Sequence, residues 1–141
     1  MIPEINYLAV IAATLSSMVV GAIWYAQKVL GGTWIRLAKV TPGEKYGPVW
    51  PIVITVIVSF ITAWVLAGAS YISYEFYQGS FMISALLTGL VLWAGFTAAR
   101  FITHDAFEGR PVGLTVLNCA HELVTVAIMS LIIGVWPPVL G

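Results

Sequence analysis

The sequence predicts an all-α integral membrane protein, a four-helix bundle with both termini facing outward. Three observations lead to this fold class. Only 9% of the 141 residues are charged, against about a quarter in a typical soluble domain. Hydrophobic residues make up 60% of the chain. Four stretches lack Asp, Glu, Lys and Arg altogether: residues 5–27, 46–74, 76–99 and 123–141.

Four membrane spans are expected, in a single domain that covers residues 1–141. A helix needs about 20 mostly apolar residues to cross the hydrocarbon core, so the chain has room for four such helices and for little else. Glycine and proline pairs mark the breaks between them. We place the spans at about residues 5–25, 50–69, 80–101 and 112–136.

The orientation follows from the basic residues. Short loops that are rich in Lys and Arg stay on the cytoplasmic side of a membrane. All six basic residues of the chain fall in or beside the first and third loops, which share a side in a four-span protein: Lys28, Arg36, Lys39, Lys45, Arg100 and Arg110. Both basic loops are therefore predicted to be cytoplasmic, with the N- and C-termini outside.

Residues 33–40 (TWIRLAKV) allow two interpretations. One is a short helix in the membrane interface, with Trp34 and Leu37 entering lipid while Arg36 and Lys39 reach back to the headgroups. The other is a loop with basic anchors. The sequence favours neither.

Small residues recur every fourth position in the first two spans, a spacing that marks close helix contacts in membranes. The first series is Ala9, Ala13, Ser17 and Gly21, and the second is Thr55, Ser59, Ala63 and Ala67. Packing within the chain is the favoured interpretation, and an oligomer contact is the other.

The fourth span contains the one charge that orientation does not explain, Glu122. It lies close to the predicted midplane, where a carboxylate costs roughly 2.5–3.5 kcal/mol on insertion scales unless it is protonated, paired or hydrated. Asn118, His121 and Thr125 lie three or four residues from it or beside it, so we expect the four side chains to share one face. His121 and Glu122, being adjacent, should point about 100° apart. A satisfied polar cluster is favoured over proton or ligand handling, and metal binding is least favoured.

A second cluster ends the third span and consists of Arg100, His104, Asp105 and Glu108. Arg100 is expected to pair with Asp105 or Glu108 at the cytoplasmic face. An interfacial salt-bridge network is favoured over a surface metal site.

The chain has no catalytic signature of the kind found in hydrolases, metalloproteases or phosphate-binding loops. It has no basic tract for nucleic acid. We therefore expect no catalytic residues, no metal and no cofactor.

Five short motifs give the chain a resemblance to the bacterial membrane family catalogued as domain of unknown function 1761: Ile5-Asn6-Tyr7-Leu8-Ala9, Gly21-Ala22-Ile23-Trp24-Tyr25, Gly32-x-Trp34, Phe107-Glu108-Gly109-Arg110-Pro111 and Asn118-x-x-His121. The resemblance covers most of the chain. It implies a compact four-helix protein of the bacterial cytoplasmic membrane, and it supplies no catalytic residues.

Small-residue packing without catalytic motifs predicts a non-enzymatic role, as a structural or accessory subunit or a binding protein. Its expected partners are the lipid bilayer and either further copies of itself or a larger membrane complex. The alternative is a small proton-coupled carrier or channel that uses His121 and Glu122. An enzyme acting on lipid through His104 and Asp105 is a more distant alternative.

Overall fold

The computed structural model describes residues 2–41 and 47–139, and the regular elements in these two ranges are all helical. Four helical stretches are long and apolar enough to cross a membrane: α1 (Tyr7–Trp24), α3 (Val49–Tyr77), the continuous stretch Phe81–Phe107, and α6 (Val112–Val135). The all-α fold class and its four spans are confirmed.

The third of these stretches is not a uniform α-helix. It consists of α4 (Phe81–Leu92), a wider π-helical turn η2 (Trp93–Ala98), and α5 (Ala99–Phe107). The sequence analysis predicted an unbroken helix here.

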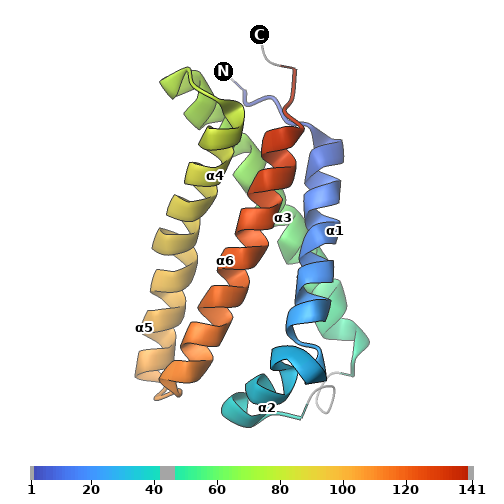
Figure 1. Cartoon of the computed structure of the whole chain (residues 1–141), viewed down its shortest axis with the longest axis vertical. Helices are drawn as coiled ribbons and strands as arrows, with labels where there is room; N and C mark the ends of the chain where they lie inside the picture. Colours follow the sequence, from blue (N-terminus) through green and yellow to red (C-terminus); the bar gives the residue numbers. More distant parts are fainter. Residues whose placement is uncertain (1, 42–46, 140–141) are drawn as a thin grey trace.

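The four stretches run alternately up and down beside one another (Figure 1). α6 packs against α1 on one side and against α4 on the other, and α3 packs against both α1 and α4. The two termini lie at one end of the molecule, whereas α2 and the connection from α5 to α6 lie at the opposite end (Figure 1). The described segments that carry basic residues therefore share an end, which we call the basic end; Lys45 lies outside the described residues.

Two helices continue beyond their predicted ends. α3 ends at Tyr77 rather than near residue 69, because Ser70 and Tyr71 are buried against neighbouring helices instead of forming a loop. Gln78 stops this helix in the left-handed conformation, with φ of 53°. The third stretch likewise ends at Phe107 rather than near residue 101.

Asn6 fixes the start of α1. Its Oδ1 accepts hydrogen bonds from the backbone N–H groups of Leu8 and Ala9, at 3.1 and 3.2 Å. These bonds satisfy two of the donors that every helix start leaves free. Its Nδ2 donates to the carbonyl oxygen of Trp136 at 3.2 Å. One side chain therefore caps α1 and ties it to the end of α6.

The segment after α1 is helical rather than an irregular loop. A π-helical turn η1 (Gln27–Gly31) leads into α2 (Gly32–Ala38), and Lys39 ends it with φ of 54°. Gly31 is needed at the junction, because a Cβ there would overlap the carbonyl oxygen of Tyr25.

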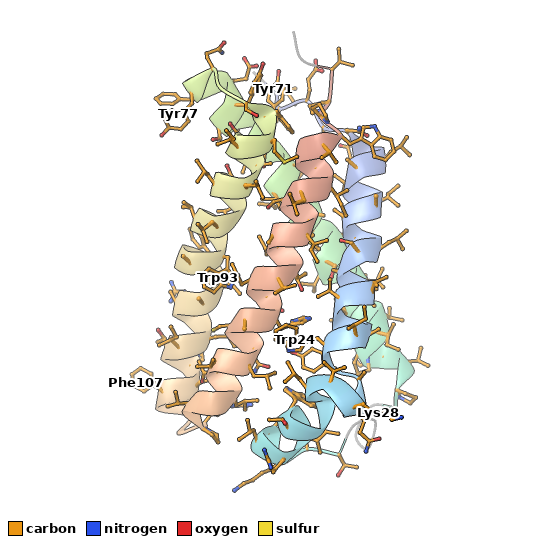
Figure 2. All side chains as sticks on the ribbon, viewed as in Figure 1. Trp24, Lys28, Tyr71, Tyr77, Trp93 and Phe107 are labelled. Carbon is orange, nitrogen blue, oxygen red and sulfur yellow. The ribbon has the colours of Figure 1, made fainter. Side chains whose placement is uncertain are left out.

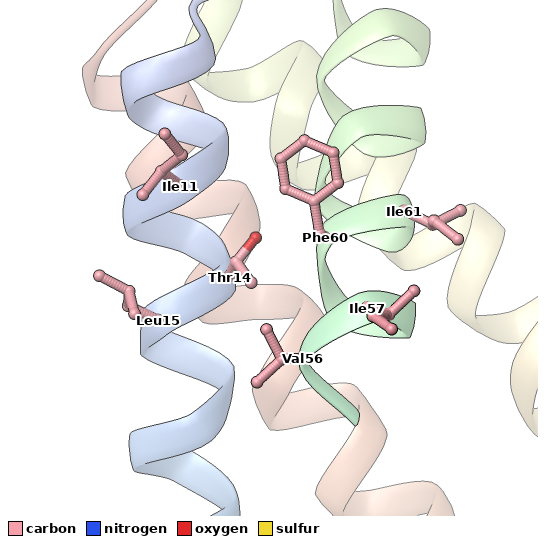
Figure 3. A pocket seen from close by; sticks show the side chains of 7 residues that line it. All are labelled: Ile11, Thr14, Leu15, Val56, Ile57, Phe60 and Ile61. Atoms are coloured by element: carbon pink, nitrogen blue, oxygen red, sulfur yellow. The ribbon is translucent and has the colours of Figure 1, made fainter. Parts of the chain in front are cut away.

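The buried core lies in the half of the molecule that contains the termini. It joins side chains of α1, α3, α4 and α6, the largest of which are Leu66, Tyr71, Phe81, Met129 and Ile133. In the other half, residues 49–58 of α3 are all exposed. An apolar groove of about 400 Å³ runs between α1 and α3 (Figure 3), lined by Ile11, Thr14, Leu15, Val56, Ile57, Phe60 and Ile61.

The predicted small-residue series lie largely inside the molecule. Ala9, Ala13 and Ser17 are buried on α1, and Gly21 is half-buried against His121. On α3 the residues Ser59, Ala63 and Ala67 are buried, whereas Thr55 is exposed.

Two close helix contacts on α4 and α6 were not predicted. A Cβ on Gly134 would lie 2.7 Å from Met82 Sδ, and one on Gly89 would overlap Ser130 Oγ. These two glycines allow α4 and α6 to approach closely.

We predict that Gly89→Ala destabilises the protein by about 1–3 kcal/mol, because the added methyl group overpacks the α4–α6 contact. The thermal unfolding midpoint in one fixed detergent measures the effect. Gly95→Ala is the matched control, since a Cβ there meets nothing within 4 Å.

Adding Ser130→Ala should recover part of the loss by removing the overlapping hydroxyl. Equal midpoints for Gly89→Ala and Gly95→Ala would contradict the prediction.

Candidate functional site

His121 lies against the end of α1, in a setting built mainly from aromatic rings. The centroid of its ring lies 4.9 Å from that of Tyr25 and 5.8 Å from that of Trp24. Gly21 leaves room for it, since a Cβ at that position would lie 3.8 Å from His121 Nε2. Figure 2 shows the Trp24 side chain between α1 and α6. The imidazole is consequently only 12% exposed.

Glu122 contacts its neighbour directly. His121 Nδ1 and Glu122 Oε1 are 3.2 Å apart, although adjacent helical positions point about 100° apart. A hydrogen bond at this distance needs one proton, carried either by the ring nitrogen or by the carboxyl group. The Glu122 side chain is 36% exposed, whereas the His121 side chain is 12% exposed.

Asn118 is linked to the same region through Tyr25. The Tyr25 hydroxyl donates to Asn118 Oδ1 at 3.4 Å. Tyr25 follows the first span, and burial together with the nearby Glu122 raises its pKa to about 12. The hydroxyl therefore keeps its proton at physiological pH and remains a donor.

The four side chains of the predicted cluster do not form one hydrogen-bonded network. Asn118 bonds to Tyr25 and His121 bonds to Glu122, while Thr125 is buried and its Oγ1 has no hydrogen-bond partner among the described residues. The buried atoms His121 Nε2 and Trp24 Nε1 have no partner there either. Hydroxyls of the other helices do not supply the missing bonds, since those of Thr14, Ser17 and Thr62 donate to carbonyls of their own helices.

Arg110 lies close to both carboxylates of the second cluster, although it was not predicted to be a member. Arg110 Nε lies 2.6 Å from Glu108 Oε2 and 3.8 Å from Asp105 Oδ1. The turn after α5 explains this, because the backbone N–H of Arg110 donates to the Asp105 carbonyl oxygen at 2.9 Å. The hydrogen bond and charge of Glu108 raise the pKa of Arg110, and Asp105 adds to the effect.

Asp105 is the buried member of this cluster, at 7% exposure. Its Oδ2 accepts a 2.6 Å hydrogen bond from the Thr115 hydroxyl on α6. This bond joins α5 to α6. The expected pairing of Arg100 with Asp105 or Glu108 was wrong, since Arg110 occupies that position instead.

A cleft of about 420 Å³ brings the two predicted clusters together. Its lining includes the whole second cluster and Asn118 of the first: Phe96, Thr97, Arg100, Phe101, His104, Asp105, Glu108, Arg110 and Asn118. Asn118 therefore borders the cleft while it also bonds to Tyr25. We call this group of polar residues, from the cleft through Asn118 to His121 and Glu122, the polar recess. The hollow itself extends only as far as Asn118, since His121 and Glu122 do not line it.

The π-helical turn η2 contributes to the wall of the cleft through Phe96 and Thr97. Trp93, at the start of this turn, donates from Nε1 to the Cys119 carbonyl oxygen at 3.0 Å, which anchors η2 to α6 (Figure 2). Turns of this kind occur frequently at functional sites. Gly95, which is inside the turn, is the only local signal of it in the sequence.

Within residues 2–41 and 47–139, no three His, Cys, Asp or Glu side chains are placed to hold a metal ion together. The chemistry available in the recess is hydrogen bonding, charge pairing and proton exchange.

Four helical stretches that are long and apolar enough to cross a membrane are the defining feature of a multi-pass membrane protein. The chain belongs to the family described as protein of unknown function (DUF1761), whose model matches residues 8–134. The family resemblance expected from the short motifs is therefore confirmed. No curated protein and no solved structure matches the chain significantly.

We predict that Asp105→Ala destabilises the protein by about 1–3 kcal/mol, because it leaves the Thr115 hydroxyl without its partner in a partly buried place. Glu108→Gln is the matched control. Its carboxylate bonds to the same arginine but is 52% exposed, and exposed ion pairs contribute little.

Thermal unfolding of both variants in one detergent tests this contrast. A larger loss for Glu108→Gln than for Asp105→Ala would contradict the role given to the buried carboxylate.

Proposed function

We propose that this chain is a non-enzymatic binding protein of the membrane, which takes a polar group into the recess from the basic end. The observation that carries the proposal is the position of Asn118. Its side chain lines the cleft and bonds to Tyr25, so polar groups continue from the cleft to the His121–Glu122 pair.

On the side of His121 away from the cleft, the large buried side chains of α6 are apolar, and Thr125 and Ser130 are its buried polar ones. Beyond His121, α6 presents Val126, Met129 and Ile133, which are buried in the core with Val10 and Leu66. A recess that ends on packed apolar side chains supports binding from one side over passage through the protein.

The alternative function is a proton-coupled carrier or small channel. The specific observation in its favour is the His121–Glu122 hydrogen bond beside a carboxylate that is 36% exposed. A carrier would need a second arrangement of the helices, in which the core opens toward the end of the molecule where the two termini lie.

An enzyme that acts through His104 and Asp105 receives less support from the geometry. A histidine that acts as a base is usually oriented by a neighbouring carboxylate. Asp105 bonds instead to Thr115 and lies near Arg110, and His104 is exposed on α5.

Assembly with further copies or with a larger membrane complex is part of the proposal. Residues 49–58 of α3 are exposed on every side of the helix, and lipid or another protein must cover them in a membrane. In the proposed orientation the basic end, and thus the mouth of the recess, faces the cytoplasm of a bacterial cell, because Lys and Arg concentrate there.

We predict that Asn118→Asp reduces the retention of bound molecules at least tenfold. The change keeps an oxygen for the Tyr25 hydroxyl but replaces the amide donor by a negative charge. Native mass spectrometry of the protein released from bilayer nanodiscs measures the retained molecules. Thr103→Ala is the control, since its exposed hydroxyl bonds only to the Ala99 carbonyl oxygen of its own helix.

Retention that is equal in the Asn118→Asp and Thr103→Ala proteins would contradict a binding role for the recess, as would a protein that retains nothing at all.

We also expect no proton flux above that of protein-free vesicles when the protein is reconstituted with an enclosed pH-sensitive dye. A flux that Glu122→Gln abolishes would favour the carrier or channel instead.

A further inference from the structure

The carboxylates of the cleft are already engaged. Glu108 bonds to Arg110 at 2.6 Å, and Asp105 accepts from Thr115 at 2.6 Å while Arg110 lies 3.8 Å away. Glu108 is thus paired with a guanidinium, and Asp105 is bonded to a hydroxyl beside the same guanidinium.

The groups that remain in the cleft are donors. Arg100 has no ion pair among the residues that the structure describes. His104 follows it by four residues and so lies on the same side of α5. The oxygen of the Asn118 amide is bonded to Tyr25, which leaves its NH₂ group free to donate. Three donors without acceptors favour a ligand that brings oxygen acceptors and negative charge.

The position of Arg100 and His104 along the third span indicates where such a ligand would come from. Its 27 residues extend about 40 Å at 1.5 Å per residue, and the hydrocarbon core is only about 30 Å thick. The last turns, which carry Arg100 and His104, consequently reach the headgroup region. Phe96 and Phe101 line the same cleft. Phe96 lies about one helical turn nearer the bilayer centre than Arg100 and is 72% exposed.

We propose that this cleft binds the phosphate group of an anionic phospholipid, with Arg100, His104 and Asn118 as its donors and the two phenylalanines beside its acyl chains. Basic residues in pockets between membrane helices bind anionic headgroups. The cleft has two arginines and two carboxylates, and Arg110 is the arginine paired with the carboxylates, which leaves Arg100 for the ligand. Its volume of 420 Å³ lies within the usual range of ligand sites, about 300–1,000 Å³. The inference rests on the proposed binding function and names its ligand class.

The test uses the full-length protein in nanodiscs that contain equal amounts of phosphatidylglycerol and phosphatidylcholine. Native mass spectrometry should show phosphatidylglycerol retained at least fivefold over phosphatidylcholine. Arg100→Gln should bring this ratio close to one. Arg36→Gln is the matched control, an exposed arginine of α2 at the same end of the molecule, and it should leave the ratio unchanged.

A second arm separates a lipid headgroup from free phosphate. Inorganic phosphate is titrated into the detergent-solubilised protein, and saturable binding that Arg100→Gln removes would identify a phosphate site that does not need the acyl chains. Such binding, without any phosphatidylglycerol preference, would support the phosphate chemistry and overturn the lipid source.

The remaining outcomes distinguish this inference from the function on which it rests. In one outcome the protein retains some other molecule, Asn118→Asp abolishes that retention, and neither a preference for phosphatidylglycerol nor phosphate binding is seen. This outcome overturns the phosphate site alone. A protein that retains nothing overturns both proposals. An equal loss of preference in Arg36→Gln would show that the positive charge of this end attracts the lipid and that the cleft has no special role.

Discussion

The close approach of α6 to α1 and α4 is the constraint on which the rest of the structure depends. Helices in lipid gain little from the hydrophobic effect, so they associate where small residues let their backbones meet. Ala9 and Ala13 supply such a surface on α1, and Gly89 and Gly134 supply it between α4 and α6. Asn6 adds a hydrogen bond between the start of α1 and the end of α6. With α6 fixed between its neighbours, the positions of its polar side chains are fixed as well.

Packing is uneven along the molecule, and the site results from this difference. In the terminal half, side chains from four helices close the core around Met129 and Ile133. Toward the basic end, α3 is exposed over residues 49–58, and the neighbouring half of α6 carries Asn118 and Glu122. Glu122 is 36% exposed there, whereas Thr125 and Ser130 in the packed half are buried and their hydroxyls have no hydrogen-bond partner among the described residues.

The fold and part of the site could be predicted from local patterns. Apolar length identifies four spans, and the mid-span carboxylate Glu122 marks the unusual part of α6. The pattern could not show that α3 continues to Tyr77, because Ser70 and Tyr71 look like loop residues until their burial is known. The sequence pattern also could not show that Arg110, and not Arg100, pairs with Asp105. A turn in the backbone decides which arginine reaches the carboxylate.

The sequence by itself determined that this is a four-span helical protein of its family and that its basic residues fall in or beside alternate loops, because hydropathy and charge act on each segment independently. Only the tertiary structure decided which polar groups share a site. Asn118 and Arg100 lie on different helices, and η2 and α6 bring them to one cleft. Whether these two side chains line the same cleft depends on how each helix is rotated about its axis and on the width of one π-helical turn. Contacts between segments far apart in the chain set both.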